Sequence, residues 1–224
     1  HTRYGTVTGI QTCALPIFRF GNKDYIPQAE DSAAAIAERE GKTAAEVAYD
    51  MLLENDGKNF IYMPITNYTG YGLSASESLL NEKMAIMGLG DGGAHVGFIL
   101  DAGFPTWLLT HWGKSTGKFD APELIRRLTS DTAEAAGLRD RGRIAVGFKG
   151  DVNVIDWDAL DFEAPYVIQD LPAGGKRLMQ GASGYDYTVV SGVVTFEKGN
   201  ATGALPGRLV RGMQKSPAIA MAAE

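Results

Sequence analysis

The side chains best suited to chemistry are concentrated between positions 91 and 111. This stretch contains two of the chain's three histidines, His95 and His111, and two carboxylates, Asp91 and Asp101. A carboxylate can act as a general base, and both carboxylates and imidazoles bind zinc. The residue types therefore fit hydrolytic chemistry, but their spacing matches no short zinc motif.

Asp91 has the most informative surroundings. It follows the apolar run Met84–Leu89, which we expect to be a buried strand, and Gly90, Gly92 and Gly93 flank it. Glycines let a backbone turn sharply and approach a ligand closely. In parallel α/β folds, functional groups follow the carboxyl ends of strands. Asp91 is therefore a candidate general base or metal ligand, and helix capping or an Asx turn is an equally good interpretation.

The two histidines and Asp101 have simpler alternatives. His95 could contact substrate or bind a metal, but a hydrogen bond within its loop is the commoner role. His111 lies in the apolar stretch TWLLTHW and fits a packing histidine better than a ligand. Asp101 most simply caps a helix or closes a turn.

A second group of polar side chains follows the apolar run Phe60–Ile65. Asn67, Tyr68 and Tyr71 could line a substrate pocket there, with Asn67 and Tyr68 as substrate-binding candidates. Loop aromatics more often serve in packing, which is the alternative.

The front half alternates apolar runs with helical patterns. Helices are expected at 31–39, 43–55, 76–80, 105–112, 122–128 and 129–136. Thr43 and Glu46 form a capping-box pattern, with Val47, Met51 and Leu52 on one face. The runs 60–65 and 84–89 are expected to be neighbouring parallel strands, so the pattern predicts an α/β fold.

The pattern changes near Asp140, where short apolar runs alternate with glycine turns. We expect strands at 143–146, 152–157, 187–190 and 193–197, with Ser191-Gly192 closing a tight hairpin. This half is predicted to be a small antiparallel sheet, followed by a frayed tail at 213–224.

Composition limits the classes of function. The chain has 224 residues, 45% of them hydrophobic, with 21 basic and 27 acidic residues and a net charge of −6. A basic nucleic-acid-binding stripe and a transmembrane run are both missing from the sequence. Cys13 has no second cysteine to pair with, so a cytoplasmic location is expected. The oligomeric state cannot be read from the sequence.

The first seventeen residues, HTRYGTVTGIQTCALPI, show no helical or strand periodicity and no initiator methionine. They resemble translated sequencing-adapter read-through, and a real irregular segment is the alternative. We therefore expect four parts: a non-native leader at 1–17, which packs poorly, α/β elements at 18–139, a β-rich part at 140–212 and the tail.

Several long segments closely resemble the N-acyl-D-amino-acid deacylases (D-aminoacylases) of the amidohydrolase superfamily. The strongest is GLGDGGAHVGFILDAGFPTWLLTHW at 88–112, and KTAAEVAYDMLLEN at 42–55 precedes it. GLRDRGRIAVGFKGDVNVID at 137–156, DLPAGGKRLMQ at 170–180, TVVSGVVTFEKG at 188–199 and TGALPGRLVRG at 202–212 also match. The resemblance covers nearly all of residues 18–212.

The resemblance implies the C-terminal part of a TIM-like barrel followed by part of a small β-sandwich. It also implies zinc or another divalent metal with a bound water. In the family, an aspartate after the last barrel strand takes a proton from that water, and Asp91 is the matching residue here. That aspartate then protonates the leaving amine of an N-acyl amino acid. His95 matches a histidine of a DGxxH pattern, with substrate binding or transition-state stabilisation as its candidate roles.

The metal-binding histidines of the family precede the matched region, so the resemblance predicts an inactive C-terminal fragment without its own metal. Two alternatives remain open. One is a different hydrolase of cyclic or linear C–N bonds in the same superfamily, since substrate choice lies in the loops. The other is a catalytically silent binding module with this fold.

Overall fold

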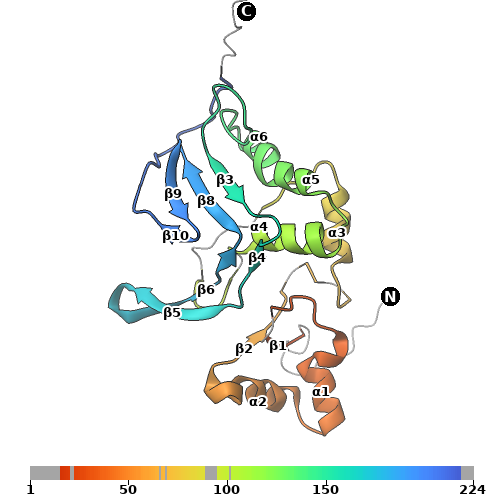
Figure 1. Ribbon diagram of the computed structural model, residues 1–224. Helices are drawn as coiled ribbons and strands as arrows, with labels where there is room; N and C mark the ends of the chain where they lie inside the picture. Colours follow the sequence, from red (N-terminus) through yellow and green to blue (C-terminus); the bar gives the residue numbers. More distant parts are fainter. Residues whose placement is uncertain are drawn as a thin grey trace, which may run out of the picture. The chain divides into compact units, whose positions relative to one another are not determined.

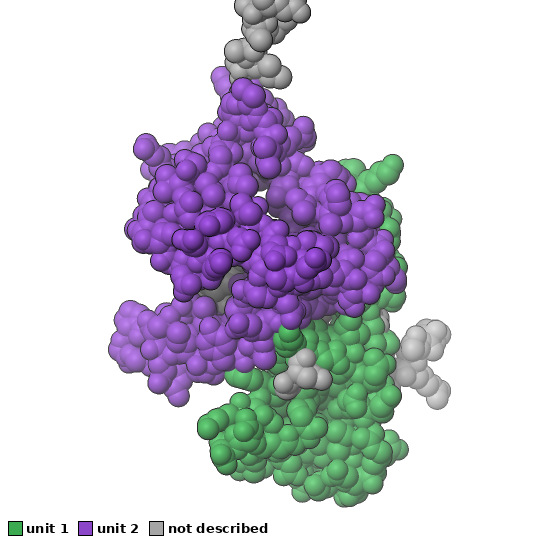
Figure 2. All heavy atoms as spheres, viewed as in Figure 1, with its two compact units in different colours: residues 1–85 green, residues 86–224 purple. Residues whose placement is uncertain are grey.

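The computed structural model describes residues 16–20, 23–65, 67–68, 70–88, 95–100 and 102–217. The chain divides into two compact units, residues 1–85 and 86–224 (Figures 1 and 2). In the described part, no helix is long and apolar enough to cross a membrane. Helices and antiparallel strands both occur, so the mixed α/β class is confirmed.

Unit 1 consists of helices and one short strand pair. Its elements are β1 (Phe18–Phe20), a 3₁₀ turn (Ala29–Asp31), α1 (Ala33–Glu40), α2 (Ala44–Gly57), β2 (Phe60–Tyr62) and α3 (Ser74–Asn81). The core of α1 and α2 is formed by Ala33, Ala37, Val47 and Met51, all at most 4% exposed. Small alanines on α1 let the two helices approach closely.

Local sequence signals set the ends of these helices. Ser32 Oγ accepts a hydrogen bond from the Ala35 N–H, and Gly41 ends α1 in the left-handed region with φ 68°. At α2, Thr43 Oγ1 accepts from the Glu46 N–H, and Glu46 Oε2 accepts from the Thr43 N–H at 2.8 Å. The predicted capping box is thus confirmed, and a capping side chain supplies a helix with about 1 kcal/mol.

The predicted face of α2 is only partly correct. Val47 and Met51 are buried, but Leu52 is 39% exposed. The backbone leaves helical geometry at Glu54–Asp56, near the predicted end at Asn55. The predicted start at Asp31 is two residues early, because α1 begins at Ala33 with Ser32 as its capping residue.

The prediction of two neighbouring parallel strands is wrong for the described residues. β2 pairs with β1 in antiparallel fashion, with Phe18 opposite Tyr62. Residues 84–88 form no strand, and Met84 is 93% and Ile86 57% exposed. A buried strand needs a neighbouring strand as its backbone partner, and no described strand pairs with residues 84–88; the Ala85 N–H instead donates to the Glu82 carbonyl in a local turn.

The leader can be judged only at its end, because residues 1–15 lie outside the described residues. Ile17 belongs to unit 1: its carbonyl accepts a hydrogen bond from the Ala33 N–H at 2.8 Å. Its side chain packs against the α1–α2 core. Ile17 thus contacts unit 1, and the assignment of residues 1–17 as a non-native leader stays a prediction.

The helical part of unit 2 consists of α-helical turns that open into wider π-helical turns. The segments are α4 (Phe104–Trp107), a π-helix (Leu108–Ser115), α5 (Ala121–Arg126), a second π-helix (Arg127–Asp131) and α6 (Thr132–Ala135). Proline lies in the first turn of both α4 and α5, as predicted. Leu108, Leu109, Trp112 and Leu124 form the buried side.

The remainder of unit 2 is antiparallel, as predicted. A four-stranded sheet has the order β10 (Asn200–Ala201), β9 (Val193–Glu197), β8 (Tyr185–Val190) and β3 (Val152–Ile155). Two smaller pairs join β4 (Asp161–Phe162) to β7 (Ala182–Ser183) and β5 (Tyr166–Leu171) to β6 (Gly175–Met179); a 3₁₀ turn (Pro172–Gly174) links β5 and β6. Ser191 and Gly192 both have positive φ, 53° and 80°, which is typical of the two-residue hairpin turn predicted there.

Two details differ from expectation. Residues 143–146 form no strand, and Ile144 and Val146 are at least 90% exposed. The predicted tail is attached at its start, because the Gln214 N–H donates to the Gly137 carbonyl at 2.8 Å. Residues 218–224 lie outside the described residues.

A lysine joins the helical part of unit 2 to the strands. Lys114 Nζ donates hydrogen bonds to the carbonyls of Trp157, Asp158 and Leu160 at 2.9, 3.0 and 3.1 Å. Leu160 is 1% exposed beneath this contact. A charged donor shared by three carbonyls fixes the loop between β3 and β4 on the helical segment.

Candidate functional site

Asp91, Gly90, Gly92, Gly93 and Asp101 lie outside the described residues. The role of Asp91 therefore stays a prediction, as does the capping role of Asp101. The described part of the candidate segment begins at His95, and α4 follows at Phe104.

His95 forms a turn through its backbone. It has a positive φ of 52°, and its carbonyl accepts hydrogen bonds from the amides of Phe98 and Ile99 at 2.9 and 3.0 Å. Its imidazole lies 5.2 Å from the Phe98 ring, and the residue is exposed. This geometry fits the loop-forming role and leaves the imidazole accessible to a ligand.

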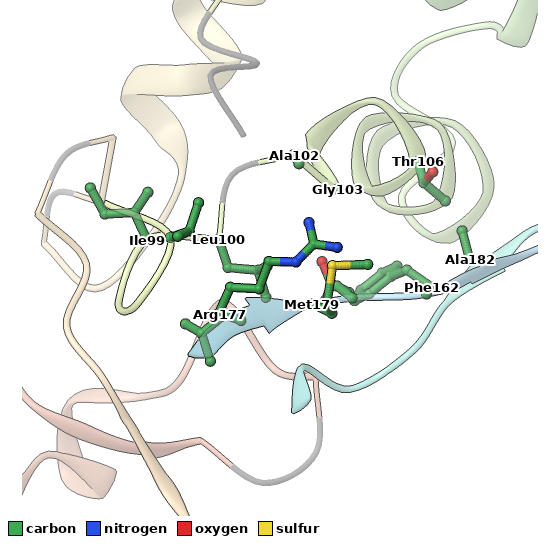
Figure 3. A pocket seen from close by; sticks show the side chains of 13 residues that line it. Ile99, Leu100, Ala102, Gly103, Thr106, Phe162, Arg177, Met179 and Ala182 are labelled. Atoms are coloured by element: carbon green, nitrogen blue, oxygen red, sulfur yellow. The ribbon is translucent and has the colours of Figure 1, made fainter. Parts of the chain in front are cut away.

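A cavity of about 320 Å³ lies next to this turn, within unit 2 (Figure 3). One wall is formed by the segment that leads into α4, and the other by β6 and the residues after it. The lining residues are Val96, Ile99, Leu100, Ala102, Gly103, Thr106, Phe162, Arg177, Leu178, Met179, Gln180, Gly181 and Ala182. The two walls are joined by a hydrogen bond from the Leu178 N–H to the Val96 carbonyl at 2.7 Å.

The polar side chains of this cavity are held in place. Arg177 forms a two-point ion pair with Asp170, with Nε–Oδ1 at 2.7 Å and Nη2–Oδ2 at 2.5 Å. This pairing raises the pKa of the guanidinium and lowers that of the Asp170 carboxyl. Thr106 Oγ1 and the Tyr185 hydroxyl lie 2.8 Å apart, within hydrogen-bond distance.

Asn67 and Tyr68 belong to unit 1, where Tyr68 has a packing role. Its hydroxyl donates to the Pro27 carbonyl, and its ring meets the edges of Phe18 and Tyr71 at 6.1 Å. Burial raises the pKa of the Tyr68 hydroxyl. Asn67 is exposed with φ 62°, and its carbonyl accepts from Ser76 Oγ at 3.2 Å. These contacts support the packing interpretation for Tyr68 and leave the Asn67 side chain accessible.

His111 is a packing residue, as its apolar setting predicts. Its ring stacks on Trp107 at 4.5 Å with an angle of 9°, and it meets Trp112 edge to face at 4.8 Å. Burial first, and the nearby Lys118 ammonium second, lower the pKa of the imidazole.

We therefore expect the stability of unit 2 to fall as the pH is lowered below about 6.5, the pKa of an imidazole in the unfolded chain. The loss should end once the pH lies below the lower pKa that His111 has in the folded chain. The unfolded chain binds a proton near pH 6.5, while the folded chain resists protonation, so the unfolded state gains protons first. Urea unfolding at pH 7.5 and at successive lower pH values measures the effect, with the imidazole titration followed by NMR. His111→Gln should remove this part of the pH dependence and His95→Gln should retain it; equal profiles in all three proteins would contradict the assignment.

The described residues do not form a metal centre by themselves. Among them, no group of three or more His, Cys, Asp or Glu side chains is placed to hold a metal ion.

Sequence reasoning missed Arg177, Gln180 and Thr106 as cavity residues. The segment Asp170–Gln180 was notable only for its resemblance to a family. Opposite charges at Asp170 and Arg177, separated by the turn Pro172–Gly174, were the available signal for a cross-strand ion pair. Nothing in the spacing placed that hairpin beside the segment that leads into α4.

Known proteins give an independent comparison. A model of the amidohydrolase family matches residues 24–196. No curated protein matches the chain. Three solved structures of D-aminoacylase match: one from a study of its binuclear metal centre, one that defined a novel subset of amidohydrolases, and a mutant in complex with CuCl₂.

These structures are 20%, 19% and 18% identical to the chain, with TM-scores of 0.46, 0.46 and 0.45. Each match covers 85% of this chain and 36% of the other chain. The chain therefore spans little more than a third of the length of the solved structures it matches. The family model spans well over half of the present chain, from residue 24 to residue 196, and the chain belongs to the amidohydrolase family.

Proposed function

We propose that the longer protein containing this chain is a metal-dependent hydrolase of the amide bond in N-acyl-D-amino acids. The observation that carries the proposal is the amidohydrolase match over residues 24–196, which includes the whole candidate segment. The choice of substrate is supported by the resemblance of residues 88–112 to the D-aminoacylases. We further propose a TIM-like barrel, to which this chain contributes the last elements.

Asp91 is the proposed general base and acid. Its carboxylate takes a proton from the water that attacks the amide carbonyl, and the same proton then moves to the departing amine. One group can serve both steps because the first leaves it protonated for the second. Glycines on both sides of Asp91 leave room for the substrate.

His95 is the proposed substrate contact within the described residues. Its backbone is fixed by two hydrogen bonds from the next turn, while its imidazole is exposed beside Phe98. A neutral imidazole can donate one hydrogen bond and accept another, which suits an N-acyl amino acid. Asn67 remains a second substrate-binding candidate through its exposed side chain.

We also propose that a divalent metal binds the longer protein. Its ligands include residues outside the described ranges, with Asp91 as one possible member.

The test is an assay of the longer protein on matched N-acetyl-D- and N-acetyl-L-amino acids and on cyclic amides, with bound metal determined by elemental analysis. We expect hydrolysis of the D series, loss of activity after chelation and recovery when the metal is returned. Preference for cyclic amides would show that the enzyme hydrolyses a different class of C–N bond from the one proposed. Folded, metal-free protein without activity on any of these would instead identify a binding module.

A further inference from the structure

The cavity beside α4 has the size and the walls of a small-ligand site. Its volume of about 320 Å³ is roughly twice that of a 150 Å³ cavity that holds benzene. Space is therefore available for about twelve non-hydrogen atoms. Aliphatic and aromatic side chains form most of the lining, from Val96, Ile99 and Leu100 on one side and Phe162 and Leu178 on the other.

Arg177 is the single charged residue among the described lining residues. Asp170 occupies its Nε and Nη2, while no described residue accepts a hydrogen bond from Nη1. Figure 3 shows the guanidinium directed into the space between Leu100 and Met179. The side chain is 33% exposed, so a ligand can reach it.

We propose that this cavity binds a small aliphatic carboxylate. The hydrocarbon part fills the space between the apolar walls, and the carboxylate accepts hydrogen bonds from Arg177 Nη1. A guanidinium is suited to this task because it stays charged and presents planar, fixed donors. The ion pair with Asp170 holds the guanidinium in position before a ligand arrives.

Two carboxylates oppose the ligand and limit its affinity. Asp170 shares the guanidinium, and the Glu163 carboxylate lies beside Gly181, where its Oε2 would be 2.3 Å from an added Cβ. The site therefore selects ligands whose apolar part contributes to binding, and it should reject small inorganic anions.

The proposal is independent of the proposed hydrolysis. N-acyl amino acids and the aliphatic acids released from them share the required chemistry, but the site uses no residue proposed to act in the reaction. Binding can therefore be measured with the 224-residue chain, and failure here would leave the proposed enzyme activity untouched.

The experiment is a two-dimensional NMR titration of the chain with hexanoate, with hexanol as a probe that lacks the carboxylate. We expect saturable shifts concentrated in residues 96–106 and 177–182, with hexanoate binding about tenfold more tightly than hexanol because of the charge-assisted hydrogen bonds. N-acetyl-D-leucine, a larger member of the same class, then tests whether the substrate class also enters the cavity.

Two variants test whether the Arg177 guanidinium binds the ligand's carboxylate. Arg177→Gln should abolish the preference for hexanoate over hexanol. Asp170→Asn should strengthen hexanoate binding, because it removes the competing charge while the asparagine Oδ1 can still accept the hydrogen bond from Arg177 Nε that positions the guanidinium. Arg19→Gln is the matched control, because Arg19 forms the same two-point pair with Glu54 in unit 1. It should leave binding unchanged.

Three results would overturn the proposal. They are shifts that do not saturate, equal affinity for hexanoate and hexanol, and a preference that persists in Arg177→Gln. If Arg177→Gln does not fold, Asp170→Asn decides the matter, since unchanged or weaker hexanoate binding in that variant would exclude Arg177 as the carboxylate partner.

Discussion

Replacing Asp91 by asparagine in the longer protein is expected to lower kcat for N-acyl-D-amino acids by about 10²–10⁴-fold. The amide has nearly the same shape as the carboxylate, but it cannot accept the proton of water at neutral pH. Both water activation and amine departure require the same group, so the upper end of the range is expected. The measurement is kcat, with metal content and folding determined in parallel.

Asp101→Asn is the matched control for this experiment. It makes the same chemical change ten residues later, at a position expected only to cap or turn the chain, and it should keep near-native kcat. If Asp91→Asn also kept near-native kcat, Asp91 would be a loop residue. If the variant lost its metal, Asp91 would be chiefly a ligand.

Replacing Gly184 by alanine is expected to destabilise unit 2 by about 3–5 kcal/mol, at the upper end of point-mutation effects. Gly184 has φ 83°, a region that alanine adopts with strain. An added Cβ would also lie 2.6 Å from the backbone N and Cα of Leu160. Because Leu160 is buried and its loop is held by Lys114, the backbone there has little freedom to move aside.

Gly203→Ala separates the backbone strain of a positive φ from the steric clash of the added Cβ with Leu160. Gly203 has nearly the same φ, 85°, but its added Cβ would meet nothing within 4 Å, so only the conformational cost of about 1–2 kcal/mol is expected. Urea unfolding followed by tryptophan fluorescence measures both variants, because Trp107, Trp112 and Trp157 all belong to unit 2. Equal losses in the two variants would show that the contact with Leu160 contributes nothing.

The features that the sequence determined by itself are local. Thr43 and Glu46 lie three residues apart, so their capping box forms within one helical turn and needs no distant partner. The Ser191–Gly192 turn is similar, since backbone preferences at two adjacent positions select the hairpin. His111 as a packing histidine was also predictable, because both tryptophans that it contacts lie within four residues of it.

The features that only the tertiary structure decided depend on distant partners. The run 84–89 has the composition of a buried strand, but residues 84–88 form none because strand formation requires a neighbouring backbone, which composition does not specify. β2 also depends on a distant partner, because it pairs with β1, which lies about forty residues earlier in the chain. Arg177 reaches the cavity because β5 and β6 fold together and the Leu178 amide meets the Val96 carbonyl. Hydrophobic burial is non-directional, so an apolar pattern specifies no partner, and only the folded chain determines which apolar segments are buried and what covers them.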